Sequence, residues 1–255
     1  MRLTGVNRNT ILDLLALIGE HCKSLLAGRI KSVPVVDVQA DEVWGFVKMK
    51  EKMRSRTQSE ADGVGDAYCF IGMERGTKLI LAWHLGRRTS EDAEEFVAKL
   101  AEATTGNFQI TTDGFEQYKT AIPNAMSGAD FVQPVKYNAT KDDAHRYSPG
   151  EVTGTTKVPC CGNPDIDRVL TSHVERQNLT VRMQNRRMTR LTNAFSKMWE
   201  NHSAALALLF AYYNFCRPHQ TLTALRKRKQ TPAMEAGLED HVWTLQELVE
   251  RSIQS

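Results

Sequence analysis

The stretch VPVVDVQADEVWGFV, residues 33–47, decides the fold that this sequence predicts. Its apolar and polar side chains alternate, with Val36, Val38 and Ala40 set against Asp37, Gln39 and Asp41. Alternation with a period of two, in a segment rich in valine, is typical of a β-strand. The stretch therefore predicts a strand that carries Asp37 and Asp41 on the same face.

The segments around this strand predict a mixed order of helices and strands. A helix precedes it, capped by Asn9 or Thr10, with one apolar face formed by Ile11, Leu14, Leu15, Ile18 and Leu25. A loop is expected over 48–65, and a loop or insertion over 138–170. The patterns predict four further strands, over 66–73, 78–85, 107–112 and 131–137. They predict helices over 90–103, over 114–122 (stopped by Pro123), from Ser172 past Phe195, and over 203–215, where the helix is buried. This order matches an α/β fold of the ribonuclease H-like kind, in which helices flank a mixed five-stranded sheet.

The chain is expected to contain three regions. Residues 4–10 look like the turn and the first residues of a DNA-recognition helix, so 1–30 is predicted to be a partial helix-turn-helix segment. A capped amphipathic helix packed on the core is the alternative. Residues 33–220 form the predicted ribonuclease H-like domain, and 221–255 a C-terminal helical extension.

Bulk composition excludes several classes of protein. With 255 residues, 41% of them hydrophobic, the chain is long enough for a large core, and wholesale disorder is excluded. Its five cysteines are odd in number and form no C-x-x-C pair, which favours a reducing cytoplasm; adjacent Cys160 and Cys161 fit a turn better than half of a metal knuckle. The longest apolar run, 204–211, is too short to span a bilayer, so we expect a cytoplasmic protein.

The net charge of +3 says little, but the distribution of charge says more. Glu175 heads a long basic segment, and no other acid appears until Glu200. The cations that follow Glu175 are Arg176, Arg182, Arg186, Arg187, Arg190 and Lys197. A carboxylate beside a run of arginines indicates a group that holds a metal ion next to a bound polyanion.

Three acids are candidates for this chemistry. Asp41 lies in the first strand, Asp113 ends a short strand, and Glu175 lies near the start of a helix. Acids on separate elements can converge on divalent cations such as Mg²⁺. Each acid also has a structural explanation: Asp113 can cap a helix, Asp41 can pair with a basic residue, and Glu175 can offset a helix dipole.

Longer motifs resemble transposases of the insertion sequence 1 family. The resemblance covers residues 4–248, and its motifs are 39–47, 111–114, 174–180, 190–197, 213–219 and 231–234. It implies a DDE transposase on a ribonuclease H-like fold, with a shortened N-terminal DNA-binding region. The implied metal-binding triad is Asp41, Asp113 and Glu175, holding two Mg²⁺ or Mn²⁺ ions. Asp37 is the chief rival for the first position, and Glu42, on the opposite strand face, is less expected as a ligand.

The resemblance also implies DNA contacts. The residues expected to bind DNA are Arg176, Asn178, Arg182, Arg186, Arg190, Arg217 and His219. Glu175, Asn178, Arg182 and Arg186 recur at helical spacing and should share one face. Trp44, Trp199 and Trp243 are assigned to packing. The expected partners are terminal inverted repeats, target DNA and a second copy of the chain, because pairing two ends requires two active sites.

Two other functions remain open from the sequence. One is a transposase-derived DNA-binding protein without catalysis, which the presence of all three acids disfavours. The other is a ribonuclease H-like nuclease without strand transfer, which only the transposase-like segments around Glu175 and Asn214 argue against.

Overall fold

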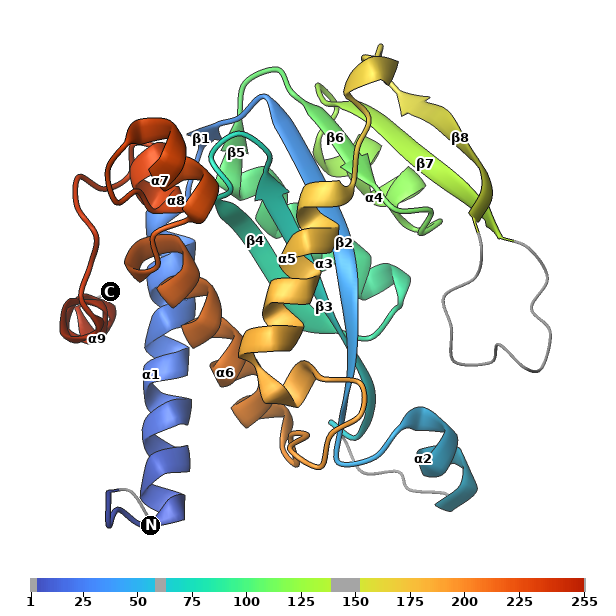
Figure 1. The fold of residues 1–255 in the computed structure, drawn as a ribbon. Helices are drawn as coiled ribbons and strands as arrows, with labels where there is room; N and C mark the ends of the chain where they lie inside the picture. Colours follow the sequence, from blue (N-terminus) through green and yellow to red (C-terminus); the bar gives the residue numbers. More distant parts are fainter. Residues whose placement is uncertain (1–3, 58–62, 139–151, 255) are drawn as a thin grey trace.

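The protein forms a mixed six-stranded sheet flanked by helices (Figure 1). The computed structural model describes residues 4–57, 63–138 and 152–254. The strand order is β4-β3-β2-β6-β7-β8, and a separate parallel pair joins β1 (Val33–Pro34) to β5 (Thr104–Thr105). This architecture is compatible with a ribonuclease H-like fold, but the main sheet has six strands where the sequence predicts five.

The predicted first strand, β2 (Asp37–Val47), lies inside the sheet. It pairs antiparallel with β3 (Gly65–Glu74), which in turn pairs antiparallel with β4 (Ile80–Gly86). On its other side β2 runs parallel to β6 (Gln109–Thr112), and β6 runs parallel to β7 (Asp130–Asn138). The four strands predicted after β2 are confirmed, with shifts of one or two residues at their ends.

The sixth strand corrects the prediction for residues 138–170. Val152–Cys161 form β8, which pairs antiparallel with β7, and Ile166–Arg168 form a 3₁₀ turn. β8 is the outer strand of the sheet, and its side chains are exposed or only partly buried. A strand without a buried apolar face has the polar composition of a loop, which explains the wrong prediction. The rest of the predicted insertion, 139–151, lies outside the described residues.

Helices cover both faces of the sheet. α5 (Ser172–Gln184) contacts Asp41, whereas α4 (Tyr118–Ala125) contacts the next residue, Glu42. Because consecutive strand residues point to opposite faces, α5 and α4 lie on opposite sides of β2. α3 (Ser90–Ala103) packs beside α4, and its predicted bounds are confirmed. α4 begins later than predicted and continues through Pro123, since burial of Tyr118, Ala121 and Ile122 holds this short helix together.

The helix predicted from Ser172 past Phe195 is much shorter in the structure. α5 ends at Gln184, and Asn185 adopts an extended backbone before a 3₁₀ turn, Arg186–Met188. The chain turns inward there to bury Met188 against Gly45 of β2, where a Cβ atom would lie 3.1 Å from the methionine sulfur. No glycine or proline marks this end, so the tertiary contact decides it.

The N-terminal helix α1 (Arg8–Arg29) is capped by Asn7 and packs against α6 (Trp199–Ala211) and α9 (Leu245–Ile253). Only its second half is in the core, because Ile18 and Leu25 are buried while Ile11 and Leu14 are exposed. The predicted single apolar face is therefore correct for half of the helix. The structure does not test whether residues 1–30 act as a helix-turn-helix segment.

The remaining helices are short. α2 (Glu51–Thr57) falls in the predicted loop over 48–65. α6 continues into a π-helical turn, Tyr212–Cys216, where the Asn214 side chain bonds the backbone N–H and C=O of Ile80 at 3.0 and 2.9 Å. α7 (Gln220–Arg226) and α8 (Pro232–Glu235) precede α9, as a helical C-terminus predicts. None of the helices in the described part of the chain is both long and apolar enough to cross a membrane.

Candidate active site

The pairing of β2 with β6 brings two predicted site residues together. Ala40 pairs with Thr112 in parallel register, and the next residues along the two strands are Asp41 and Asp113. Carboxylate oxygens of Asp41, Glu42 and Asp113 lie within 4.8 Å of one another. We call these three residues the acid group. It lies where β6 ends, at the carboxyl edge of a strand, a common position for binding sites in open α/β sheets.

The Asp41 carboxylate is oriented by groups on two elements. Its Oδ1 accepts a hydrogen bond from the backbone N–H of Glu42 at 2.8 Å, and its Oδ2 accepts one from Nδ2 of Asn178 at 2.7 Å. Asn178 lies on α5, and Gln39 fixes the start of that helix because its Oε1 accepts from the N–H groups of His173 and Val174. The structure therefore places Asn178, predicted as a DNA-binding residue, directly on the first acid.

Asp113 lies in a turn that Gln133 holds in place. Asp113 Oδ1 accepts from the N–H of Phe115 at 3.1 Å. The buried Gln133 amide, on β7, donates to the Asp113 carbonyl at 2.8 Å, to the Phe115 carbonyl at 3.0 Å and to Thr112 Oγ1 at 3.1 Å. A glutamine in the middle of a strand pattern gives no sign of this role, so sequence reasoning missed it.

Glu42, which the sequence favours less as a ligand than Asp41, is the third member of the acid group. Its side chain points to the face of β2 opposite Asp41. The three carboxylates still meet, because Asp113 lies past the end of β6. The Glu42 carboxylate is almost fully buried, accepts a hydrogen bond from Tyr118 Oη at 2.6 Å and lies 3.3 Å from Arg88. Burial raises the pKa of Glu42 to about 8, and the charge of Asp113 adds to the effect. Without a bound cation, this carboxyl group keeps its proton near neutral pH.

Glu175, the third predicted ligand, is not a member of the acid group. It lies on α5 one helical turn before Asn178, on the same side of the helix, and is exposed. Its Oε1 accepts a hydrogen bond from Thr171 Oγ1 at 3.0 Å, at the start of the helix. The structure thus brings Asp41 and Asp113 together and places Glu175 on the neighbouring helix.

The predicted DNA-binding arginines do not share one helical face. Arg176 is exposed on α5, whereas Arg182 is partly buried and donates to the Met188 carbonyl at 2.8 Å. Arg186 and Arg190 lie beyond the end of α5, so Arg186 does not share the helical face with Glu175, Asn178 and Arg182 that its spacing predicts. Both line an open hollow of about 820 Å³ together with Phe46 and Lys50.

His219 lies near His173 at the start of α5, whereas the Arg217 guanidinium faces the side-chain amide of Gln184, the last residue of that helix. The N–H of His219 donates to the Gln230 carbonyl at 2.8 Å, and its ring is half-buried. Burial lowers the pKa of His219, and the nearby charges of Lys78, Arg217 and His173 lower it further. His219 therefore belongs to a basic cluster with Lys78 and His173 around the amino end of α5.

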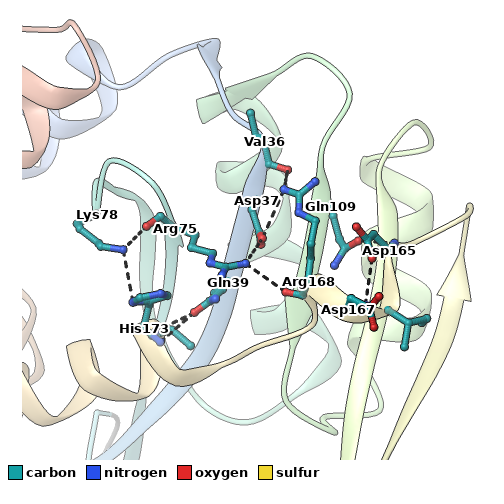
Figure 2. Close-up of polar contacts among 12 residues, drawn as sticks. Val36, Asp37, Gln39, Arg75, Lys78, Gln109, Asp165, Asp167, Arg168 and His173 are labelled. Carbon is teal, nitrogen blue, oxygen red and sulfur yellow. Dashed lines mark hydrogen bonds and ion pairs between the residues drawn. The ribbon is translucent and has the colours of Figure 1, made fainter.

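Asp37, the rival for the first position, lies in a different environment. Figure 2 shows its carboxylate between two guanidinium groups, with Oδ2 at 3.0 Å from Arg75 and 3.5 Å from Arg168. Burial raises the pKa of Asp37, and the two arginines partly offset that effect. Asp37 therefore forms ion pairs through Oδ2, whereas its buried Oδ1 has no hydrogen-bond partner among the described residues; it lies two same-face steps along β2 from Asp41.

A second group of possible metal ligands joins β4 to α3. It consists of His84, Asp92 and Glu95. The ammonium group of Lys99 lies 3.0 Å from His84 Nδ1 and 2.7 Å from Glu95 Oε1. His84 Nε2 lies 2.7 Å from Asp92 Oδ1. The Lys99 ammonium group therefore already contacts His84 and Glu95, and these side chains together form a polar link between β4 and α3.

Comparisons with known proteins identify no family for the chain. No protein-family model matches it, and no curated protein matches it. Among solved structures, a piggyBac transposase in a synaptic complex with hairpin DNA has 11% sequence identity and a TM-score of 0.34; the match covers 87% of this chain but only 55% of the piggyBac chain. Endonuclease V from Bacillus subtilis has 14% identity and a TM-score of 0.25, with 72% of this chain and 86% of that chain covered. Similarities this weak carry no argument about the site.

Proposed function

We propose that the chain is a DDE-type transposase, which cuts phosphodiester bonds at insertion-sequence ends and joins the freed 3′-hydroxyl to target DNA. The observation that carries the proposal is the side-by-side placement of Asp41 and Asp113 on β2 and β6. The resemblance of the segments around Asp41, Asp113 and Glu175 to insertion sequence 1 transposases supports the same reaction. A sheet compatible with a ribonuclease H-like fold is consistent with both.

The acid group fits a divalent cation. Mg²⁺ binds oxygen ligands at about 2.0–2.1 Å in an octahedron, which places ligand oxygens roughly 3–4 Å apart. The three carboxylates, with oxygens within 4.8 Å, need only small movements to reach this spacing. Mg²⁺ or Mn²⁺, when bound, would activate the attacking oxygen and neutralise charge on the phosphate. Asp41 and Asp113 would hold the cation with Glu42, and Glu175 is the proposed ligand from α5 for a second ion.

The other residues of the site position these ligands. Asn178 orients Asp41, Gln133 holds the turn that carries Asp113, and Arg88 lies beside both Glu42 and Asp113. DNA phosphates are the proposed partners of the exposed Arg176 and of the other predicted DNA-binding residues. A homodimer or larger assembly would pair two element ends, with one active site for each.

A strand-transfer assay tests the proposal. The protein is incubated with labelled DNA carrying candidate inverted repeats, a target plasmid and Mg²⁺ or Mn²⁺. We expect Asp113→Asn and Glu175→Gln to abolish both cutting and joining, because each removes a proposed ligand. Glu94→Gln, at an exposed position of α3, is the matched control and should keep full activity.

Each outcome separates the candidate functions. Undiminished cutting by Glu175→Gln, together with loss in Glu42→Gln, would exclude Glu175 and make Glu42 the third ligand. Cutting without joined product would indicate a nuclease without strand transfer. Specific binding of the repeats by the unaltered protein, without cutting at any metal concentration, would indicate a DNA-binding protein derived from a transposase.

A further inference from the structure

Beyond the acid group, β2 carries a row of aromatic side chains. Glu42, Trp44 and Phe46 alternate along the strand and so share one face, with about 6.6–6.8 Å between successive side chains. Tyr68 of β3 lies opposite Trp44 on the same face. α4 covers the Glu42 end of this row through Tyr118. Trp44 and Tyr68 are only partly buried, whereas Phe46 is buried, with its ring centroid 5.0 Å from that of Phe195.

Cationic side chains accompany the aromatic rings. The Lys50 ammonium lies 5.6 Å from the ring centroid of Trp44 and 5.7 Å from that of Phe46. The Arg88 guanidinium lies 6.0 Å from the Tyr68 ring. At the far end of the row is the hollow of about 820 Å³, whose described lining includes Lys50, Arg186 and Arg190 and no carboxylate. The row therefore combines flat apolar surfaces with positive charge.

This combination matches the chemistry of an unpaired nucleic-acid strand. Aromatic rings stack on exposed base faces, and lysine and arginine bind the phosphates between them. In a duplex the bases are stacked on each other, and phosphates of one strand follow at about 3.4 Å along the axis. The wider spacing of side chains along β2 suits a strand whose bases are drawn apart.

We propose that Trp44 and Tyr68, supported from beneath by the buried Phe46, act together with Lys50, Arg88, Arg186 and Arg190 to bind an unpaired DNA strand that leads away from the acid group. We call this surface the aromatic track. The inference rests on the proposed function, because Glu42 belongs both to the acid group and to the start of the same row. It adds a substrate form, a DNA end with unpaired nucleotides, to that function.

The test measures binding where no cutting can occur. A fluorescein-labelled 12-nucleotide oligo(dT) and a 12-base-pair duplex are titrated with protein in EDTA, and anisotropy is recorded at several salt concentrations. We expect the oligonucleotide to bind more tightly than the duplex. Trp44→Leu should weaken oligonucleotide binding between about 5-fold and 100-fold, the effect typical of losing one stacked base, while Trp44→Phe keeps most of the affinity.

Charge variants on the surface provide a second test that does not depend on core packing. Lys50→Gln combined with Arg190→Gln should weaken binding and reduce the salt slope by about 1.4, since each phosphate contact contributes about 0.7 for a single strand. The matched control is Arg228→Gln combined with Lys229→Gln, an exposed pair after α7 that removes the same charge. Its binding should stay close to that of the unaltered protein.

Two results would overturn the aromatic track. One is oligonucleotide binding that neither Trp44→Leu nor the Lys50/Arg190 variant changes. The other is an equal loss of duplex affinity in these variants, which would indicate a general DNA surface. If the protein binds the oligonucleotide through the track but never cuts DNA, the proposed function is wrong and the track stands. If the protein cuts and joins DNA but its track variants bind the oligonucleotide normally, the track is wrong and the proposed function stands.

Discussion

The two halves of β2 place carboxylates in different charge environments. Near its start, Asp37 is held between Arg75 and Arg168 (Figure 2). Four residues later, Asp41 meets Glu42 and Asp113 instead, and three carboxylates gather where β6 ends. Guanidinium groups beside a buried carboxylate stabilise its charged form, whereas neighbouring carboxylates destabilise the charged forms of one another. A bound cation would stabilise the second arrangement, whereas two arginines already contact the acid in the first.

The sharpest test of this contrast compares Asp41→Asn with Asp37→Asn. We expect Asp41→Asn to lower the cleavage rate at least about 100-fold, because loss of even an outer-shell partner of a metal ligand costs roughly 10–100-fold. Asp37→Asn should leave the rate of the folded protein nearly unchanged. Single-turnover cleavage with excess enzyme measures both. A comparable loss in Asp37→Asn would show that the two positions are not functionally different.

The pH dependence of stability tests the crowding in the acid group. The pKa of Glu42 is raised from 4.5 to about 8, mainly by burial. The folded protein therefore keeps a proton that the unfolded chain releases, so without metal the free energy of unfolding should fall as pH rises from about 4.5 to 8. At about 1.4 kcal/mol per pKa unit, the fall attributable to Glu42 is at most about 5 kcal/mol.

Urea unfolding in EDTA at pH 5 and pH 8 measures this effect. Glu42→Gln should remove most of the fall, and saturating Mg²⁺ at pH 8 should restore stability to the unaltered protein by binding its folded form. Equal pH slopes in the two proteins would mean that burial does not raise the pKa of Glu42.

Stability should report on the other half of β2. Asp37→Asn removes the charge that Arg75 and Arg168 contact, and losing a partner of a buried charged group costs about 1–3 kcal/mol. Both arginines are about one-third exposed, so the lower half of that range is expected. Urea unfolding at pH 7 provides the measurement. If Asp37→Asn were as stable as the unaltered protein, the ion pairs of Asp37 would contribute nothing to stability, and Asp37 would not be a structural contact.

The smallest effect is expected for Asn178→Ala. It removes the 2.7 Å hydrogen bond to Asp41, a partly buried contact, and should cost about 1 kcal/mol or less. The same unfolding experiment applies, with Thr180→Ala, at a position on α5 that points away from Asp41, as the control. A loss larger than that of Asp37→Asn would mean that Asp41 is held as a structural contact too.

The sequence predicted the parts of the molecule that depend on local pattern. The alternation in 33–47, the helix over 90–103 and the apolar helix near residue 203 all follow from side-chain periodicity, and all are present. Asp41 and Asp113 could be singled out because each acid interrupts or ends an apolar strand. Predictions failed where the local pattern is weak: β8 has no buried face, and α5 ends without a helix-stop residue.

Other features were decided only when distant segments came together. β6 pairs with β2 across about 70 intervening residues, and this register alone sets Asp113 beside Asp41 and draws Glu42 into the same group. Arg75 and Arg168 also reach Asp37 from distant segments, 38 and 131 residues away along the chain, so no spacing in the sequence distinguishes Asp37 from Asp41. The sequence by itself determined which residues are acids on strands, because periodicity is local. Only the tertiary structure decided that Asp37 meets two arginines while Asp41, Glu42 and Asp113 meet one another beside a single arginine, Arg88, because charge environment depends on atoms brought close by folding.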